Sequence, residues 1–161
     1  MTGGELPPLV VELEVRAPVD HAFRTWVGEA ARWWPPGHTV TGDPVAVVFE
    51  PRVGGRIFER GADGVEHDWG EVVRWDPPHR LAYRWHLFFA ADDATDVEVT
   101  FTPCESGTEV RLVQTGWDRL GEDGPSRRAR TTSGWAAVIA PYAEWLIAHP
   151  SPNDPLPEDH P

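Results

Sequence analysis

Apolar residues recur at every second position in six short runs between residues 45 and 116. In one such run Val97, Val99 and Phe101 fall on one side, and polar residues separate them. Alternation with a period of two is typical of a strand with one buried face. Six short strands joined by turns predict an antiparallel meander, and this pattern limits the fold more than any other feature of the chain.

Glycine and proline pairs mark the corners of the predicted sheet. Gly54-Gly55 precedes the strand-like run "RIFER", and Pro77-Pro78 stands between two aromatic, arginine-containing runs. We predict turns at both places and a third tight turn at residues 106–107. Gly70 lies inside a longer strand-like run, where an isolated glycine indicates a bulge or a bend.

The chain before the meander combines one strand with helical spacing. Residues 9–16 alternate and predict a strand that stops at Pro18. We expect Asp20 to cap the helix that follows, and Gly28 to divide it from a second short helix ending near Trp33.

A long helix is predicted after the meander, from about residue 126 to residue 149. Pro141 lies inside it, removes one backbone hydrogen bond and is expected to kink it. We interpret the residues from Trp117 up to this helix as a loop. The apolar stripe of the helix consists of Trp135, Val138, Ile139, Tyr142, Trp145 and Leu146.

The order of elements (strand, two short helices, six strands, long helix) predicts an α+β fold in which a curved antiparallel sheet wraps around the C-terminal helix. The helix must bury its apolar stripe, and the concave face of the sheet is the large apolar surface against which it can pack. Because a curved sheet and a helix do not close on each other everywhere, we expect a ligand-sized cavity between them. We predict a flexible lead-in at residues 1–8, one domain at 9–148 and a proline-rich disordered tail at 149–161.

Charge and cysteine content exclude several partner classes. The formal net charge of −12 would repel nucleic acid and anionic membrane surfaces, so we expect neither as a partner. Cys104 is the single cysteine, and no run resembles a leader or a membrane span, which together predict a cytoplasmic protein. The sequence allows a homodimer without indicating one.

Several stretches, in this order and spacing, resemble the START-like (SRPBCC) superfamily and its helix-grip fold. They are "VRAPVDHAFRTWV" near the start, "RVGGRIFE" (52–59), "GEVVRWDPPHRLAYRW" (70–85), "VTFTP" (99–103), "GTEVRLVQTGW" (107–117) and "SGWAAVIAPYAEWL" (133–146). The branch they resemble most is that of the bacterial heat-shock-protein ATPase activator homologues. The resemblance implies a pocket for a hydrophobic small molecule. It does not imply one reaction, since relatives bind lipids, act as aromatases or cyclases of polyketide pathways, or assist a chaperone.

Aromatic and apolar residues are the ligand-binding candidates, because pocket walls are mainly apolar and aromatic and flat rings stack on them. No catalytic motif, metal-ligand spacing or cofactor motif is present, so we predict no catalytic residue, no metal and no cofactor. The predicted ligand-binding residues are Trp33, Phe58, His67, Trp69, Trp85, Trp117, Trp135, Ile139 and Tyr142.

Two polar groupings leave alternatives open. His67, His86 and Glu59 would transfer protons or bind a metal if one face of the sheet gathered them, and otherwise lie on the rim or the convex face. The mid-strand arginines are a clamp for a ligand carboxylate inside the pocket, or partners of acidic residues on the solvent face, and the second reading is favoured. These arginines are Arg56, Arg84 and Arg111, and their expected partners are Glu59, Glu98 and Glu109.

Three functions follow. The first is binding of a hydrophobic or aromatic small molecule in the cavity under the C-terminal helix. The second is a cyclase or hydrolase acting on a polyketide-like or aromatic substrate in the same cavity, using His67 or His86. The third is a co-chaperone-like role that depends on exposed apolar surface around Trp33-Trp34 or Trp117 and, as the resemblance implies, on a chaperone partner.

Overall fold

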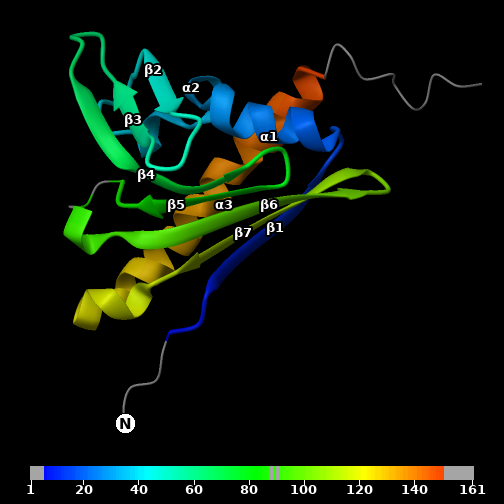
Figure 1. Cartoon of the computed structure of the whole chain (residues 1–161). Helices are drawn as coiled ribbons and strands as arrows, with labels where there is room; N and C mark the ends of the chain where they lie inside the picture. The colour runs from blue at the N-terminus through cyan, green and yellow to red at the C-terminus, as the bar shows by residue number, and fades with distance from the viewer. Residues whose placement is uncertain (1–5, 88, 90, 151–161) are drawn as a thin grey trace, which may run out of the picture.

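The computed structural model describes residues 6–150 apart from 88 and 90. In these residues one antiparallel sheet holds seven strands in the order β1-β7-β6-β5-β4-β3-β2, so the last six strands form a meander and β7 returns beside β1. Figure 1 shows the sheet curving around α3, which crosses behind it. The elements are β1 (Leu9–Val15), α1 (Val19–Gly28), α2 (Ala30–Trp33), η1 (Pro36–His38), β2 (Ala46–Phe49), β3 (Arg56–Arg60), β4 (Glu66–Asp76), β5 (Arg80–Trp85), η2 (Ala91–Asp93), β6 (Thr95–Cys104), β7 (Gly107–Thr115), η3 (Trp117–Asp123) and α3 (Gly124–Ala148).

The predicted α+β helix-grip fold and its order of elements are confirmed. The period-two runs are strands because one face of each packs on the core: Val97, Val99 and Phe101 of β6 are buried, and the residues between them are half-exposed. Gly28 ends α1 and a second short helix follows it, as expected.

Details at the helix ends differ from the prediction. The segment expected to be a loop, residues 117–123, is the 3₁₀ helix η3, and α3 begins at Gly124. Asp20 is not a cap, because the helix begins one residue earlier; its carboxylate instead pairs with Arg24 at a distance of 3.1 Å, one turn along the helix.

Glycine at two sheet positions is required by the backbone. Gly54 closes the turn between β2 and β3 with a φ of +85°, a conformation that favours glycine. Gly70 lies in β4, where a Cβ atom would overlap the carbonyl oxygen of Arg84 on β5. Register shifts beside this position, between Ile57 and Phe58 of β3, and further along β4 bend the sheet.

The core lies between the sheet and α3. Trp135, Val138, Tyr142 and Leu146 are buried, and Ile139, predicted to share this stripe equally, is only half-buried. The helix continues through Pro141. Tyr142 donates its hydroxyl hydrogen bond, 2.8 Å long, to the carbonyl oxygen of Ala22, which joins α3 to α1. None of the helices in the described ranges is long and apolar enough to cross a membrane.

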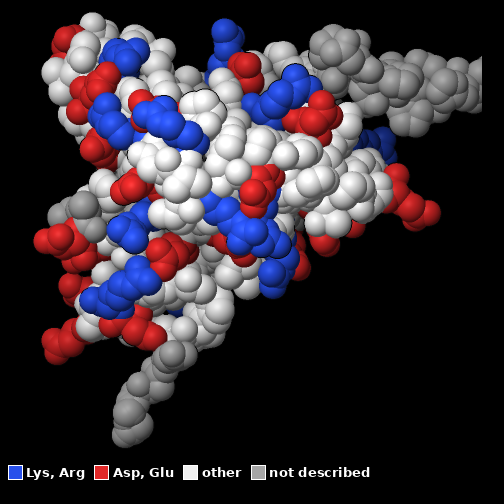
Figure 2. All heavy atoms as spheres, in the orientation of Figure 1, with Lys and Arg blue, Asp and Glu red and all other residues white. Residues whose placement is uncertain are grey.

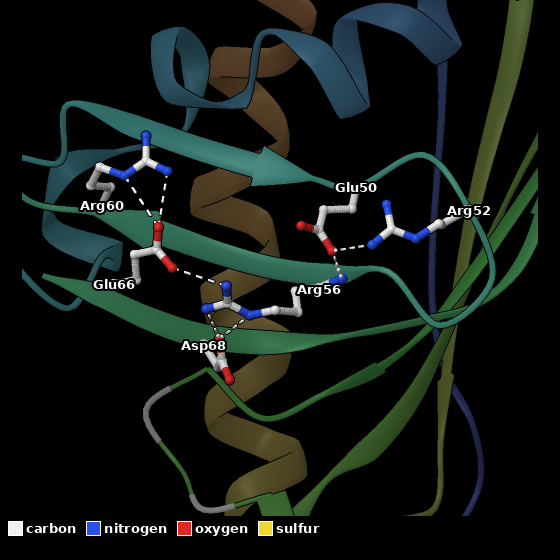
Figure 3. A network of polar contacts seen from close by, with 6 residues as sticks. All are labelled: Glu50, Arg52, Arg56, Arg60, Glu66 and Asp68. Carbon is white, nitrogen blue, oxygen red and sulfur yellow. Dashed lines mark hydrogen bonds and ion pairs between the residues drawn. The ribbon is translucent and has the colours of Figure 1, made fainter. Parts of the chain in front are cut away.

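The outer face of the sheet carries mixed charge, and arginines and carboxylates are interspersed over it (Figure 2). Arg56 pairs with Glu66 at 2.9 Å and with Asp68 at 2.6 Å, and Arg60 also pairs with Glu66 (Figure 3). Arg111 likewise pairs with Glu12, and Arg84 is exposed. The mid-strand arginines therefore lie on the solvent face, as the favoured interpretation of the sequence predicted, but their acidic partners are not the predicted ones.

Candidate functional site

A cavity of about 230 Å³ lies between the sheet and the N-terminal half of α3. Its wall is formed by a segment after α2, by the end of β5 and the residues that follow it, by β7 and by α3. The lining residues are Trp34, His38, Trp85, Leu87, Phe89, Gln114, Arg127, Arg130, Thr131, Gly134, Trp135 and Val138.

Half of this lining is one face of α3. Residues 127, 130, 131, 134, 135 and 138 recur at the three- and four-residue intervals that place side chains on one side of a helix. This face changes character along its length, from arginine and threonine at its beginning to tryptophan and valine towards its middle. Gly134 lies at the change, and a Cβ atom placed there would meet no other atom within 4 Å.

Three tryptophans from separate elements form the aromatic wall. The rings of Trp85 and Trp135 are stacked, with centroids 6.0 Å apart and planes inclined by 26°. Trp34 contacts both, with centroid distances of 5.9 Å to Trp85 and 5.8 Å to Trp135. A flat apolar molecule against this wall would meet ring faces and edges, which aromatic ligands favour.

Hydrogen bonds fix the orientation of this wall. The Trp135 indole nitrogen donates to the side-chain oxygen of Gln114 at 2.7 Å, and the Gln114 amide nitrogen donates to the Thr95 hydroxyl at 2.7 Å. Trp117 donates its indole hydrogen bond to the backbone oxygen of Gln114 at 3.0 Å. Gln114 is buried, so these bonds satisfy its polar groups and hold the Trp135 ring in place.

The segment that carries Trp34 and His38 is held by a buried carboxylate. Glu59 of β3 accepts hydrogen bonds from the backbone nitrogens of Val40 at 2.6 Å and Thr41 at 2.9 Å. It also accepts one from the indole nitrogen of Trp69 at 2.8 Å. Burial alone would raise the pKa of Glu59, but these bonds to its charged form outweigh burial and leave the pKa below its usual value.

Positive charge gathers at one end of the cavity. Arg127 is only 5% exposed, donates to the backbone oxygen of Asp93 at 2.7 Å and lies 3.6 Å from the centre of the Phe89 ring. Burial lowers the pKa of Arg127, Asp93 partly offsets this, and the like charge of Arg130 lowers the pKa further. Within the described chain, no aspartate or glutamate belongs to the lining.

The structure brings two of the nine predicted ligand-binding residues into the lining, Trp85 and Trp135. Trp69 lies behind them, 5.0 Å from Trp34 between ring centroids. Trp33 and Tyr142 pack against each other deeper in the core, and Trp117 is buried beside Gln114. Ile139 is half-buried on α3, one residue past the lining.

Phe58 and His67 lie farther from this wall. Phe58 is on the outer face of the sheet, where the Arg56 guanidinium covers its ring at 4.2 Å from the centroid. His67 is the half-buried cross-strand partner of Glu59, but the Glu59 carboxylate is already occupied by the bonds described above. The ring of His86 points elsewhere, with Nδ1 3.2 Å from the Phe89 carbonyl oxygen. Over the described ranges, no three His, Cys, Asp or Glu side chains are grouped to hold a metal ion.

The polar lining residues were not among the predicted site residues. Arg127 and Thr131 precede Trp135 by eight and four residues, so the same helical spacing that predicted the apolar stripe also places them on its face. No sequence pattern identifies Gln114 as a lining residue, because a single polar residue on the inner face of a strand does not reveal which residues it contacts. His38 lies in a proline-flanked segment without a period.

Comparison with known proteins identifies the family of this chain. The family described as Activator of Hsp90 ATPase homolog 1-like protein matches residues 16–143. The chain belongs to this family. Its fold is the START/SRPBCC type that the sequence resembled. No curated protein matches the chain closely enough to count as a relative.

Solved structures agree with the family. Protein MLL2253 from Mesorhizobium loti is 23% identical, with 89% of this chain and 98% of that chain covered and a TM-score of 0.68. DynU16, described as a putative protein in the dynemicin biosynthetic locus, is 21% identical, with 87% and 47% covered and a TM-score of 0.65. At these identities the likeness shows the fold alone. The anthrahydroquino-γ-pyrone synthase Txn09, solved in complex with SUM, is 34% identical, with 87% and 97% covered and a TM-score of 0.59.

Proposed function

We propose that the protein binds a small, flat aromatic molecule in the cavity between the sheet and α3. The observation that carries this proposal is the wall of Trp34, Trp85 and Trp135, whose rings pack on one another and line the cavity. A core that is packed to ordinary density has few voids of this size, and those with aromatic walls are the usual sites for small ligands.

The size of the cavity limits the ligand. Its volume of about 230 Å³ exceeds the ~150 Å³ of an engineered cavity that binds benzene, and is below the ~300 Å³ at which drug-sized pockets begin. A molecule of one or two fused rings fits this range.

The family supports the same reading, since a related protein, 34% identical, is a synthase of an anthrahydroquino-γ-pyrone and so handles a flat aromatic compound. Fold and family alone do not determine a ligand. The proposal therefore depends on the cavity of this chain, and the relative adds support for the aromatic character of what enters it.

A cavity-filling variant tests the proposal. Titration of the wild-type protein with naphthalene derivatives should change tryptophan fluorescence with saturation, because three tryptophans line the cavity. Gly134→Leu should abolish this binding, since the new side chain enters open space within the cavity. Ala137→Leu is the matched control, because Ala137 is an exposed residue of the same helix and outside the lining. Unchanged binding in Gly134→Leu would contradict the proposal.

A second candidate function is catalysis of ring closure on such a molecule, and two observations favour it. The relative named above is a synthase, and His38 gives the cavity an imidazole, the side chain most often used as a general acid or base. This role differs from the sequence-based one, which used His67 or His86. His38→Ala should abolish turnover of an aromatic polyketide mimic while leaving its binding within about threefold; equal turnover in the variant would remove His38 from any mechanism.

The co-chaperone reading has less support from this geometry. It depended on exposed apolar surface at Trp33-Trp34 or Trp117, and all three side chains are buried, at 3%, 5% and 1% exposed. A chaperone partner would therefore have to recognise another surface.

A further inference from the structure

We infer that the ligand of this cavity is an aromatic anion, whose carboxylate or enolate group binds Arg127 and Arg130 while its ring lies against Trp85 and Trp135. This inference rests on the proposed function and names the chemical class of the ligand. It assigns the anion-binding role to residues of α3, not to the mid-strand arginines that the sequence suggested.

The first argument is the state of Arg127 without a ligand. Its guanidinium has five donor hydrogens, and one hydrogen bond, to the carbonyl oxygen of Asp93, is formed in the part of the chain that the structure describes. Across that same part, none of the ion pairs with carboxylates involves Arg127. A cation that is 5% exposed and forms no ion pair is costly, and the charge of Asp93 offsets this cost only in part, so the remaining donors of Arg127 are suited to an anion inside the cavity.

The second argument is the local accumulation of positive potential. Arg127 lies in the first turn of the 25-residue helix α3, where the helix dipole disfavours a cation, and Arg130 lies three residues further on the same face. The protein as a whole carries 26 acidic and 14 basic residues, yet the described lining contains two arginines and no carboxylate. An anion at this end would be attracted by both guanidinium groups.

The third argument is the arrangement along α3. Arg127, Thr131 and Trp135 follow one another at four-residue intervals on the cavity side, which places the charged group, a hydroxyl and the indole ring in a row. A flat ring with an acidic group at one end matches this row. Guanidinium groups bind carboxylates through paired hydrogen bonds and are therefore selective for such a head group.

The test compares three isosteric probes at about pH 7.5, where a carboxylic acid is ionised. They are 2-naphthoate, the neutral 2-naphthamide and the cationic 2-naphthylmethylammonium, and their affinities are measured by calorimetry. The wild-type protein should bind naphthoate at least about tenfold more tightly than naphthamide, and the cation most weakly. Arg127→Gln should weaken naphthoate binding about 10- to 100-fold, which is the usual worth of a hydrogen bond to a charged group, and leave naphthamide within about threefold.

Two further variants make the result interpretable. Arg84→Gln is the matched control, because Arg84 is an exposed arginine of β5 next to the lining residue Trp85, and its affinity for naphthoate should be unchanged. Arg130 is exposed, so Arg130→Gln should fold even if Arg127→Gln proves unstable. It should weaken the binding of naphthoate and leave that of naphthamide unchanged.

The outcomes separate this inference from the proposed function. Equal affinity of the wild-type protein for naphthoate and naphthamide overturns the anion inference and leaves the aromatic site intact. An equal loss of both probes in Arg127→Gln and no effect of Arg130→Gln also overturns it, since Arg127 would then only shape the cavity. Absence of binding by all three probes overturns both proposals.

Discussion

Glu59 offers a direct test of how the cavity is held together. This carboxylate is 0% exposed and accepts three hydrogen bonds, two from backbone nitrogens of the segment after His38 and one from Trp69. Glu59→Gln keeps the shape of the side chain but replaces one oxygen with an amide nitrogen. Because all three partners are donors, the new nitrogen must face one of them as a second donor.

The size of the effect follows from these bonds. One hydrogen bond to a charged group, worth about 1.5–3 kcal/mol, is lost, and the other two lose the charge that strengthens them. The variant no longer buries a charge, which returns part of this cost. We therefore expect Glu59→Gln to lower the free energy of unfolding by about 2 kcal/mol, or the Tm by roughly 4–8 °C for a domain of this size.

The pKa of Glu59 also predicts how the effect of Glu59→Gln on stability changes with pH. The hydrogen bonds hold the pKa of Glu59 in the folded protein below that of the unfolded chain, which is about 4.3. The carboxylate therefore stabilises the fold above the unfolded value, and this contribution is lost as the pH falls through the folded value. The difference between wild type and Glu59→Gln should be largest near neutral pH and shrink as the pH is lowered below about 4.

Urea unfolding at about pH 7 and about pH 3.5, followed by circular dichroism, measures both effects. Glu71→Gln is the control, since Glu71 is an exposed carboxylate of the adjoining strand β4 and its loss should change stability by less than about 0.5 kcal/mol. A variant as stable as wild type at neutral pH, or a difference that grows on acidification, would refute the reasoning.

Three further predictions concern stability. Among the described atoms the buried Tyr83 hydroxyl has no hydrogen-bond partner, so Tyr83→Phe should be neutral or stabilising by up to about 1 kcal/mol. Tyr142→Phe loses the hydrogen bond to Ala22 and should cost about 1 kcal/mol. The order of the Tm values of the two variants checks this prediction. Gly134→Ala should raise stability by about 0.5–1 kcal/mol, because it improves helix propensity without a clash, and a fall in Tm would contradict it. Arg56→Gln should cost less than about 1 kcal/mol in urea unfolding, and its effect should shrink in about 1 M salt, because its ion pairs are exposed.

The fold could be predicted because its signals are periodic and local. Apolar residues at alternate positions, such as Val97 and Val99, are typical of a strand in a sheet with one buried and one solvated face. Glycines mark positions that other residues fit poorly: Gly54 at a corner has a positive φ, and a Cβ atom at Gly70 inside β4 would overlap the carbonyl oxygen of Arg84. These signals are read over a few residues and do not depend on what lies across the core.

The candidate site depends on what lies across the core, and there the prediction was less complete. Ile57 and Phe58 are adjacent and both apolar, so alternation alone does not decide which of them faces inward. The structure turns Ile57 to the core and places Phe58 on the opposite face of the sheet, where Arg56 and Arg60 cover its ring. Glu59 was expected on the solvent face as the partner of a mid-strand arginine, yet it is buried. Three donors, two of them in a loop some twenty residues away, make its burial favourable.

The position of the cavity follows from how aromatic volume is distributed along α3. Towards its C-terminal half, Tyr142 packs on Trp26 and Trp33, with ring centroids 5.0 Å apart in both pairs, and these rings fill the space under the sheet. Towards its N-terminal half the same face offers Gly134, which has no side chain, and Arg127, which is buried and forms no ion pair with a carboxylate in the described chain. The unfilled volume and the only partly compensated charge of Arg127 therefore share one cause, namely the change of residue type along a single helical face. A ligand with a ring and an acidic group would supply both the missing volume and the missing charge, and for this reason the cavity and its arginines are best regarded as one site.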